Sequence, residues 1–557
     1  MSLASAVIAR RLHLPRARTR AVVCERDLRV TMDDGAVLLA DRYVARESSG
    51  EAQPTVLVRS PYGRRQAFGL IFGRLLAERG LQVLVQSVRG TFGSEGAFSP
   101  FDERADGLAT LRWIRAQSWH ARRIGMIGPS YLGLVQWAVA PEAGPDLAAL
   151  AIQVSASQFH GQTYAGGSLA LETAASWLVL VAAQERRLAP LSMLRALRRL
   201  PTLFEQLPIG DLDARATGTE IAWFREALAS PERADAYWAA RDFAAGVERV
   251  TAPVQLIGGW HDIFLPWMLE DFAALQAAGR APQLMIGPWT HTSPGLLAAT
   301  LHDGLGWLRA HLLDDQRLRA PASVRVFLTG ERSGGGWRAL AAWPPPGAGE
   351  RRLWLAADGR LDGVPPQPGA AEPGEGPSAE HYRYDPARPT PSLGGPVLLA
   401  RAPVRDNREL EARSDVLIYT SAALSEATEA IGPVRVEIHV RASLPHFDLF
   451  ARVCDVDVGG ASWNVCDGLV RNIPGRFPEA GDGTVLVAFE LWPIAHRFAA
   501  GHRIRLQVSS GAHPRYARNP GTGEDIATAT ELRTVDVEVL RDAEHPSLLV
   551  LPAAASA

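Results

Sequence analysis

Short apolar runs recur through the first half of the chain, and helical stretches separate them. Residues 22–44 alternate apolar and polar positions around Asp33, Asp34 and Gly35, which predicts a β-hairpin. The later runs do not alternate; they are Thr55–Val58, Gln82–Val85, Ile124–Ile127, Leu150–Val154, Val254–Ile257 and Leu284–Ile286. Strands that are apolar on both faces and spaced by helices are typical of a parallel sheet covered on both sides. The pattern therefore predicts an α/β fold.

Two later regions depart from this rhythm. Residues 157–245 are rich in Ala, Leu, Arg and Trp at helical spacing, which predicts a helical insertion. Beyond about residue 315 the chain has short β-like segments and Pro- and Gly-rich loops, which predict an all-β sandwich or jelly roll. These segments are Val324–Leu328, Leu353–Leu355, Val434–Val440, Val485–Leu491, Ile504–Val508 and Val535–Leu540.

The length of 557 residues exceeds what a single hydrophobic core supports, so we expect several domains. The predicted order is an α/β domain in two parts, 1–156 and 246–315, with helices 157–245 inserted between them. A jelly-roll domain, 316–557, follows.

Composition narrows the classes of function. The chain has 58 basic and 60 acidic residues and a formal net charge of −2, so no global field draws it to nucleic acid or to an anionic membrane. We expect a small-molecule partner instead. The chain has no lysine, which excludes a Schiff-base lysine, a Walker-A lysine and a Ser-x-x-Lys nucleophile.

The cysteines and the apolar stretches bear on the compartment. Cys24, Cys454 and Cys466 form no Cys-x-x-Cys pair and leave an odd thiol, as expected of a reduced protein without a zinc site. The apolar stretch Leu3–Ala9 precedes a group of arginines, the reverse of a secretory signal, and no later stretch reaches 18 apolar residues. We expect a soluble cytoplasmic protein that needs no metal or cofactor, and a homodimer stays open.

One motif carries candidate chemistry. The sequence GPSYLG, residues 128–133, follows the apolar run Ile124–Ile127 and precedes a helical stretch. A serine on a strand-to-helix turn in such a sheet is aimed at the ligand site, so Ser130 is a candidate nucleophile. The motif is not the common Gly-x-Ser-x-Gly turn, because Leu132 takes the place of the second glycine. Alone it is a weak signal.

Two further polar residues follow apolar strands in the order that α/β-hydrolases use, which is Ser, acid, His. Asp262 lies in GGWHDIF, residues 258–264, and His291 lies in GPWTHTS, residues 287–293. Asp262 would orient His291, and His291 would take the proton of Ser130. His261 is the rival to His291, but adjacent residues of a strand point apart, which favours His291.

An acyl-transfer site also needs donors for the developing oxyanion. The backbone N–H of Tyr131, directly after the candidate nucleophile, is one. The hydroxyl of Tyr62, just past the predicted strand Thr55–Val58, is the second candidate, although a tyrosine in such a loop is more often structural.

Together these motifs resemble the CocE/NonD hydrolases, the group of cocaine esterases, α-amino-acid ester hydrolases and X-Pro dipeptidyl-peptidases. The matches run in order over most of the chain: RSPYG (59–63), VRGTFGSEG (88–96), WIRAQSWHARRIGMIGPSYLG (113–133), GGWHDIF (258–264), GPWTH (287–291), WR and WPP within 337–345, and SDVLIYTS (414–421). The resemblance implies an α/β-hydrolase domain with an inserted helical cap and a C-terminal jelly roll. The chain departs from the family pattern at Ser87, where many members have an aspartate.

Carried over residue by residue, the resemblance implies Ser130 as nucleophile, His291 as base and Asp262 as the orienting acid. It also implies that the Tyr62 hydroxyl and the Tyr131 N–H form the oxyanion hole. Members that take α-amino acyl groups have an acidic pair soon after the triad aspartate.

Here Ile263, Phe264 and Leu265 follow Asp262, and Phe264 matches an acyl-pocket position of the cocaine-esterase branch. An apolar lining predicts an uncharged aliphatic or aromatic acyl group, and Trp177 of the cap is a further candidate for the pocket. An acidic cap residue that reached the pocket would change this preference; the candidates are Glu172, Glu185 and Glu220.

The main hypothesis is therefore a serine esterase or amidase that works through an acyl-enzyme on an ester or amide substrate. An acyl-enzyme shielded from water reacts with other nucleophiles, which keeps an acyltransferase or a lactone-forming or lactone-opening enzyme open. An X-Pro aminopeptidase and a non-catalytic binding scaffold built on the jelly roll are the remaining alternatives.

Overall fold

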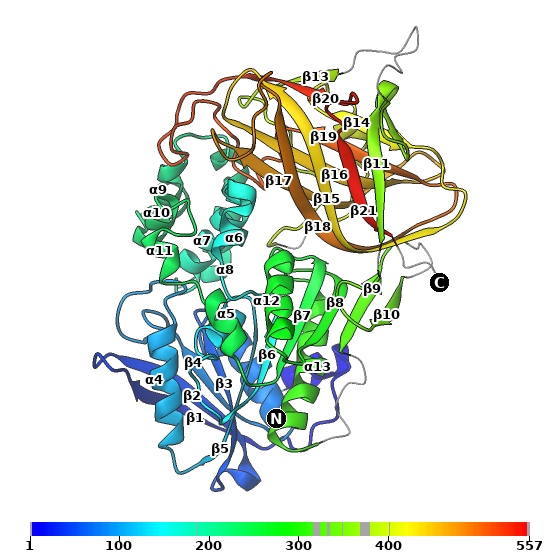
Figure 1. Ribbon diagram of the computed structural model, residues 1–557. Helices are drawn as coiled ribbons and strands as arrows, with labels where there is room; N and C mark the ends of the chain where they lie inside the picture. Colours follow the sequence, from blue (N-terminus) through cyan, green and yellow to red (C-terminus); the bar gives the residue numbers. More distant parts are fainter. Residues whose placement is uncertain are drawn as a thin grey trace. The chain divides into compact units, whose positions relative to one another are not determined.

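A mostly parallel sheet organises the first half of the chain (Figure 1). The computed structural model describes residues 3–186, 188–315, 323–330, 335–347, 349–367, 379–399 and 402–553. The strands of this sheet are β1 (Val22–Thr31), β2 (Val37–Ala45), β3 (Gln53–Ser60), β4 (Gln82–Ser87), β5 (His120–Pro129), β6 (Leu147–Gln153), β7 (Val254–His261), β8 (Gln283–Thr290), β9 (Val324–Leu328) and β10 (Gly336–Leu340). Each apolar run predicted as a strand coincides with one of them, except that Val154 lies just beyond β6.

The order of these strands is β1-β2-β4-β3-β5-β6-β7-β8-β9-β10. β1 and β2 form the predicted antiparallel hairpin, and β3 to β8 run parallel. The chain passes from β3 outward to β4 and then returns to the other side of β3 with β5. The direction of winding therefore reverses between β3 and β5. Ligands of open α/β sheets bind at the carboxyl ends of the strands at such a switch point.

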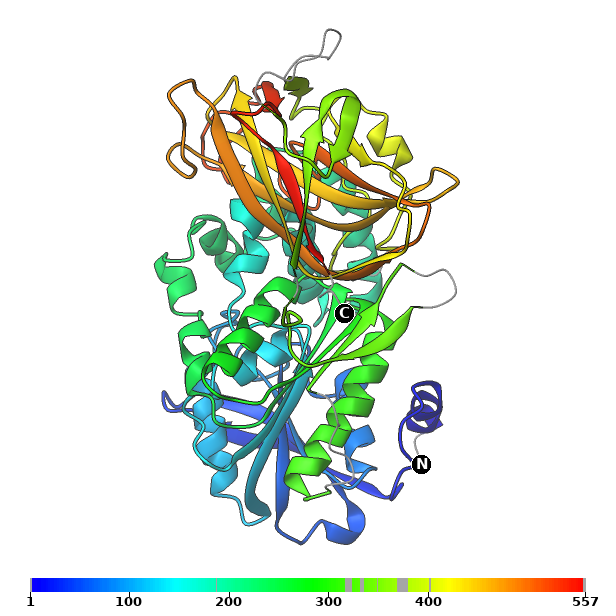
Figure 2. The same ribbon diagram turned by 45° about the vertical axis from the view of Figure 1, so that its right-hand side comes forward.

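Helices cover both faces of this sheet. A β-carbon on Gly125 of β5 would lie 2.8 Å from Leu308, whereas one on Gly128 would collide with Leu132. Since residues 125 and 128 point to opposite faces of a strand, α13 and α5 lie on opposite sides, and α13 crosses the front of the sheet in Figure 2. The helices outside the 157–245 stretch are α1 (Leu3–Arg11), α2 (Gln66–Phe68), α3 (Leu75–Ala77), α4 (Arg104–Arg115), α5 (Tyr131–Trp137), α12 (Leu265–Ala277) and α13 (Pro294–Leu312).

The stretch predicted as an insertion contains helices in its described residues. They are α6 (His160–Thr163), α7 (Leu171–Ala183), α8 (Ala189–Leu203), α9 (Leu212–Thr217), α10 (Ala222–Leu228) and α11 (Ala236–Ala239). The chain forms two units, and this stretch is divided between them. The first unit comprises residues 1–160, 180–193 and 233–324, and the second comprises 161–179, 194–232 and 325–557. A separate cap over 157–245 and its boundaries therefore stay predictions.

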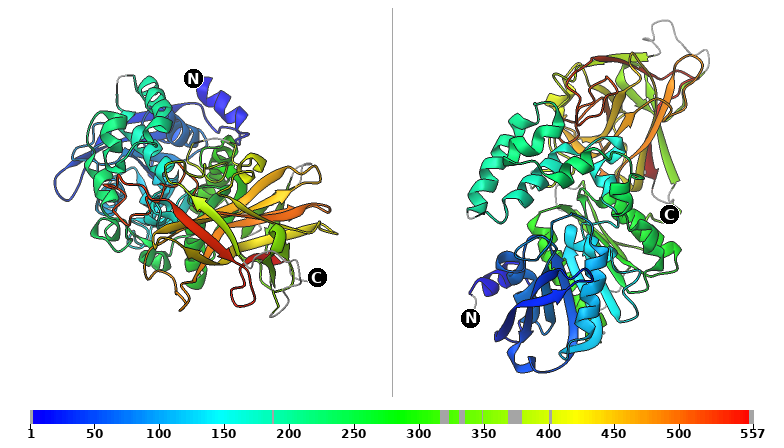
Figure 3. Two further views of the ribbon diagram at one scale, coloured as in Figure 1. Left: turned by 90° about the horizontal axis from the view of Figure 1, so that it is seen from above. Right: turned by 90° about the vertical axis from the view of Figure 1, so that its left-hand side faces the viewer.

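The second unit is rich in β-strands, which confirms a C-terminal β domain (Figure 3). Beyond β9 and β10, which belong to the first sheet, its strands are β11 (Gly349–Ala356), β12 (Arg360–Asp362), β13 (Ala379–Tyr384), β14 (Leu417–Ser421), β15 (Thr428–Ala442), β16 (Phe447–Val456), β17 (Ser462–Asn472), β18 (Val485–Phe498), β19 (Arg503–Ser509), β20 (Val535–Leu540) and β21 (Leu548–Ala553). A short helix, α14 (Arg408–Glu411), precedes β14. The main path runs β13-β20-β15-β21-β11-β12-β14-β19-β16-β17, and β18 pairs with β15.

The jelly-roll description of this unit stays a prediction, and so does the boundary at 315/316, which adjoins residues outside the described ranges. Within the described ranges, no helix combines the length and apolar character that a membrane crossing requires.

Candidate active site

Ser130 lies on the turn between β5 and α5, where the backbone is strained. Its φ of 59° and ψ of −124° form a combination that residues with a side chain rarely adopt. The flanking glycines allow the turn: a β-carbon on Gly128 would collide with Leu132, and one on Gly133 would collide with Ser155. Backbone strain of this kind clusters at functional sites.

Backbone hydrogen bonds hold the strained residue on both sides. The N–H of Ser130 donates to the carbonyl of Gln153 at 2.8 Å, which ties the turn to the end of β6. Its carbonyl accepts from the N–H groups of Gly133 and Leu134 at 2.8 and 3.1 Å, which starts α5. The position of Ser130 is therefore set by the neighbouring strand and helix.

Asp262 and His291 meet at the carboxyl ends of β7 and β8. The Nδ1 of His291 lies 2.6 Å from Oδ2 of Asp262, and both side chains are buried. The other oxygen, Oδ1, accepts from the N–H of Phe264 at 2.8 Å. An ionised carboxylate only accepts hydrogen bonds, so Nδ1 carries the proton and Nε2 is left as the acceptor. Of the two histidines that the sequence offers, His291 makes this contact with Asp262, whereas His261 ends β7.

Tyr62 follows the end of β3. Its N–H donates to Oγ of Ser60 at 3.0 Å, and its half-buried ring stacks on Phe68 with the centroids 5.3 Å apart. β3 is the direct neighbour of β5, so Tyr62 and Ser130 follow the two strands that flank the switch point. The tertiary structure thus brings the loops of the two residues to the same edge of the sheet.

Tyr131 presents two different groups. The prediction concerns its backbone N–H, but its side chain, which is 1% exposed, is also fully engaged. The hydroxyl donates to Oε1 of Glu103 at 2.5 Å and accepts from the N–H of Phe101 at 3.1 Å. Burial raises the pKa of Tyr131 well above its usual value, so the phenol stays protonated and keeps donating.

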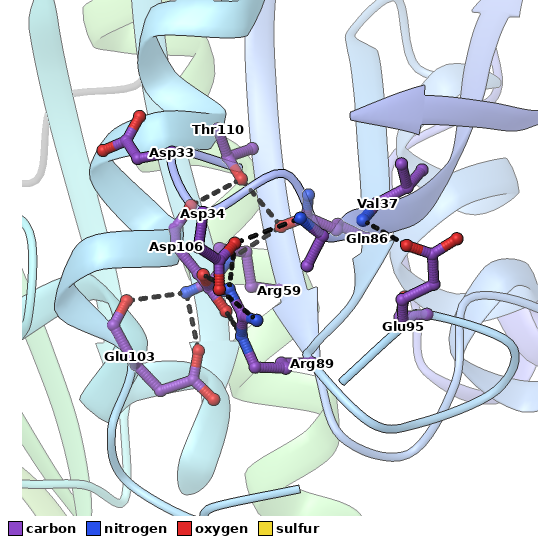
Figure 4. A network of polar contacts seen from close by, with 12 residues as sticks. Asp33, Asp34, Val37, Arg59, Gln86, Arg89, Glu95, Glu103, Asp106 and Thr110 are labelled. Atoms are coloured by element: carbon purple, nitrogen blue, oxygen red, sulfur yellow. Dashed lines mark hydrogen bonds and ion pairs between the residues drawn. The ribbon is translucent and has the colours of Figure 1, made fainter. Parts of the chain in front are cut away.

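Glu103 is a residue that sequence reasoning missed. Its Oε2 lies 2.7 Å from Nη1 of Arg59 (Figure 4), and both side chains are buried. Arg59 also donates from Nη1 to the carbonyl of Glu103 at 3.1 Å and from Nε to Oε1 of Gln86 at 2.8 Å. Burial raises the pKa of Glu103, and the charge of Arg59 and the hydrogen bond from Tyr131 oppose that shift.

An aromatic wall, Phe264, Phe159 and Phe101, runs from His291 to Tyr131. The ring of Phe264 lies 5.7 Å from that of His291, and Phe159 packs on Phe264 at 4.3 Å. Phe101 lies 5.0 Å from Phe159 and 5.6 Å from Tyr131. Phe159 and Phe101 were not predicted as site residues, because an isolated phenylalanine in a sequence indicates no more than a core position.

The other predicted pocket residues divide between the two units. Ile263 is buried beside Phe264 on the turn before α12. Trp177 belongs to the second unit, where its ring packs on Trp223 at 5.1 Å. A place for Trp177 in the pocket stays a prediction.

The acidic candidates have partners of their own. The carboxylate of Glu185 accepts from the N–H of Phe92 at 3.0 Å. Glu220 pairs with Arg225 at 3.1 Å in the second unit, to which Glu172 also belongs. Ser87, where the family pattern is broken, is buried and accepts from Arg64 at 3.2 Å, which supports a structural role for this position.

In the described part of the chain, no three His, Cys, Asp or Glu side chains are arranged to hold a metal ion.

Comparisons with known proteins identify the family. The family model for X-Pro dipeptidyl-peptidase (S15 family) matches residues 34–293, and that for the X-Pro dipeptidyl-peptidase C-terminal non-catalytic domain matches 317–550. Cocaine esterase from Rhodococcus sp. (strain MB1 Bresler) is 30% identical over 94% of this chain and 97% of its own length. The chain belongs to the CocE/NonD hydrolases. The family is one of serine esterases and peptidases.

Solved structures share the fold of this CocE/NonD hydrolase over nearly its whole length. An alpha-amino acid ester hydrolase has a TM-score of 0.79 at 22% identity, with 97% of this chain and 98% of that chain covered. An aminopeptidase from a marine sediment Thaumarchaeota archaeon has a TM-score of 0.78 at 21% identity, with 97% of each chain covered. At these identities the likeness concerns the fold alone.

Proposed function

We propose that this CocE/NonD hydrolase cleaves a carboxylic ester through an acyl-enzyme on Ser130, with an uncharged, apolar acyl group preferred. The observation that carries the proposal is the buried 2.6 Å contact between His291 and Asp262, at the same edge of the sheet as the strained Ser130 turn. The 30% identity to cocaine esterase favours an ester over an amide.

In the first half of the reaction, Oγ of Ser130 attacks the ester carbonyl carbon while Nε2 of His291 accepts the hydroxyl proton. Asp262 holds the imidazole in the required tautomer and stabilises the imidazolium. The carbonyl oxygen becomes an oxyanion that accepts hydrogen bonds from the Tyr62 hydroxyl and the Tyr131 N–H. The intermediate then expels the alcohol, which takes the proton from His291.

In the second half, water attacks the acyl-enzyme and His291 accepts a proton from it. The second tetrahedral intermediate uses the same two donors. Its collapse breaks the bond to Ser130, which recovers its proton from His291, and the carboxylic acid leaves. Every step uses a proton acceptor or donor of the chain itself, so the mechanism we propose needs no cofactor.

The aromatic wall supports the proposed acyl preference. Phe264 is buried and lies next to His291, where the acyl group of a bound ester would be placed, and the buried Phe159 packs on Phe264. The apolar side chain of Ile263 follows Asp262 directly. An α-ammonium group in this position would lose its hydration without gaining a carboxylate partner, at a cost of several kcal/mol.

We further propose that the helices of 157–245 act as a cap, that the second unit is a jelly roll, and that the partner is a small ester rather than nucleic acid or membrane. The number of copies in the active enzyme stays open.

The nucleophile is tested by Ser130→Ala. We expect covalent labelling by a fluorophosphonate probe to disappear and the ester hydrolysis rate to fall by at least ~10³-fold, because nucleophile and base act as a unit. The matched control is Ser118→Ala, an exposed serine near the opposite end of β5, which should keep both labelling and activity. Labelling that persisted in Ser130→Ala would refute the assignment.

The acyl preference is tested with two esters that differ by one charge. A phenylacetyl ester should have a kcat/KM at least ~10²-fold above that of the matching phenylglycyl ester with a protonated amine, which corresponds to about 2.7 kcal/mol. The N-acetylated phenylglycyl ester is the control, and it should recover much of the lost rate because its charge is gone. Equal rates, or a preference for the amino ester, would show that a carboxylate reaches the pocket.

A further inference from the structure

A buried ion pair links the two backbone segments that carry the proposed oxyanion donors. Arg59 lies on β3, three residues before Tyr62, and its partner Glu103 holds the side chain of Tyr131. Neither Arg59 nor Glu103 takes part in the mechanism described above. Their position between the two donor residues calls for a separate explanation.

On the side of Tyr62, Arg59 fixes the end of β3. Figure 4 shows its guanidinium between Gln86 and Glu103. It donates to Gln86 at 2.8 Å, which joins β3 to β4, and it contacts both the carbonyl and the carboxylate of Glu103. A β-carbon on Gly107 of α4 would lie 3.2 Å from Nη1, so the backbone of α4 packs directly against the guanidinium. The segment that leads to Tyr62 therefore starts from a fixed point.

On the side of Tyr131, Glu103 fixes the first residue of α5. The 2.5 Å hydrogen bond from the phenol to Glu103 and the 3.1 Å bond from Phe101 use both the donor and an acceptor site of the hydroxyl. Phe101 itself has a φ of 71°, a strained value that the surrounding contacts maintain. Because the hydroxyl cannot leave its position without breaking these bonds, the side chain holds the backbone of Tyr131 where it joins Ser130.

We propose that Glu103 is a positioning residue that sets the two oxyanion donors relative to each other, through Arg59 toward Tyr62 and through the phenol of Tyr131 toward its N–H. The inference rests on the proposed function, because it assumes that these two groups bind the oxyanion. Donors stabilise an oxyanion only when both lie about 2.7–3.1 Å from its position, so a small shift between the segments is costly.

The test uses Glu103→Gln and Tyr131→Phe. Each variant should lose ~10-fold or more in kcat with KM changed less than ~3-fold, because oxyanion stabilisation is felt in the transition state. The affinity for an arylboronic acid, which forms a tetrahedral adduct with a serine hydroxyl, should fall by the same factor as kcat/KM. A role confined to folding predicts a lower melting temperature at unchanged kcat, and that result would overturn the proposal.

Thr110→Val is the matched control. Thr110 donates to Gln86 at 3.0 Å in the same buried network but contacts neither Tyr62 nor Tyr131. This variant should lower the melting temperature while kcat and the boronic acid affinity stay at the wild-type values. A drop in kcat as large as that of Glu103→Gln would also overturn the proposal.

The double variant Glu103→Gln/Tyr131→Phe tests whether the two residues act through their shared hydrogen bond. If they do, the double variant loses no more kcat than Glu103→Gln alone; independent effects would multiply and contradict the proposal. Should Glu103→Gln fail to fold, Tyr131→Phe decides alone, since it removes one oxygen atom. Fluorophosphonate labelling of Ser130 in each variant tests the proposed function separately, because labelling persists if only the positioning role is wrong.

Discussion

Three buried carboxylates, one in the second unit and two in the first, have different partners. In the second unit, Asp467 on β17 lies between two arginines, 2.8 Å from Arg452 and 2.5 Å from Arg515. In the first unit, Glu103 has one arginine and one tyrosine. Asp271 on α12 pairs with no arginine in the described part of the chain and accepts hydrogen bonds from the N–H and hydroxyl of Ser157 at 2.8 and 2.5 Å.

The pKa values of these three carboxyl groups differ as their partners do. Burial by itself would raise the pKa of Asp467, but Arg515 and Arg452 bring it below its usual value. Burial raises the pKa of Glu103, and it raises that of Asp271 to about 8. Asp467, which is held by two arginines, joins neighbouring strands. Glu103 also contacts Tyr131, the residue that follows the strained Ser130. A buried ion pair therefore indicates a function only when it also contacts a residue of the candidate site.

The largest expected effect comes from Asp467→Asn, which removes the carboxylate that two arginines share. This change leaves two buried arginines without a carboxylate, which should destabilise the second unit by about 3–5 kcal/mol. Calorimetry should show a lower melting temperature. The kcat per labelled Ser130, measured below that temperature, should stay close to the wild-type value.

Asp536→Asn is the control in the same unit. It removes an Asp536–Arg383 pair of the same chemistry on the exposed surface, with the two atoms 2.6 Å apart, and should hardly change the melting temperature. If Asp467→Asn lowered kcat as strongly as Glu103→Gln, the contrast between the two networks would be wrong.

The next effect concerns the rate alone. Tyr62→Phe removes one proposed oxyanion donor and should lower kcat by roughly 10²–10³-fold, or about 2.7–4 kcal/mol, with little change in KM. Its melting temperature should stay near that of the wild type, because the ring and its stacking on Phe68 are kept. Steady-state kinetics with a neutral ester measures this, and a near-native kcat would return Tyr62 to a structural role.

The last effect is a pH dependence of the stability that arises from Asp271. Its pKa of about 8 in the folded protein exceeds the usual unfolded value of about 3.9, so the folded state holds one more proton between these limits. This stabilisation is complete below about pH 4, weakens by about 1.4 kcal/mol per unit as the pH rises, and is gone above about pH 8.

Thermal unfolding of wild type and Asp271→Asn between pH 5 and 8 measures the difference in slope. The variant should lose stability less steeply with rising pH, because an amide does not titrate in this range. Glu248→Gln, an exposed carboxyl nearby in the chain, should keep the wild-type slope. Parallel curves for wild type and Asp271→Asn would contradict a raised pKa at this position.

The strands were predictable to very different degrees in the two units. In the first unit, every run from β3 to β8 is apolar because helices cover both faces. In the second unit, β16 was missed although all of its residues are buried. Its sequence has Asp448, Arg452 and Asp455 among the apolar residues. Charged residues predict an exposed segment as long as their partners on other strands are unknown.

The sequence by itself determined the candidate nucleophile, acid and base, because each follows an apolar run by a few residues and their order along the chain is that of a known family. The pairing of Asp262 with His291 needed only that two neighbouring parallel strands end at one edge. The tertiary structure alone decided the support of this site: Glu103 meets Arg59 and Tyr131 across 44 and 28 positions of the chain. A contact of that kind depends on how β3, β5 and α4 pack in space, and no local pattern of residues records it.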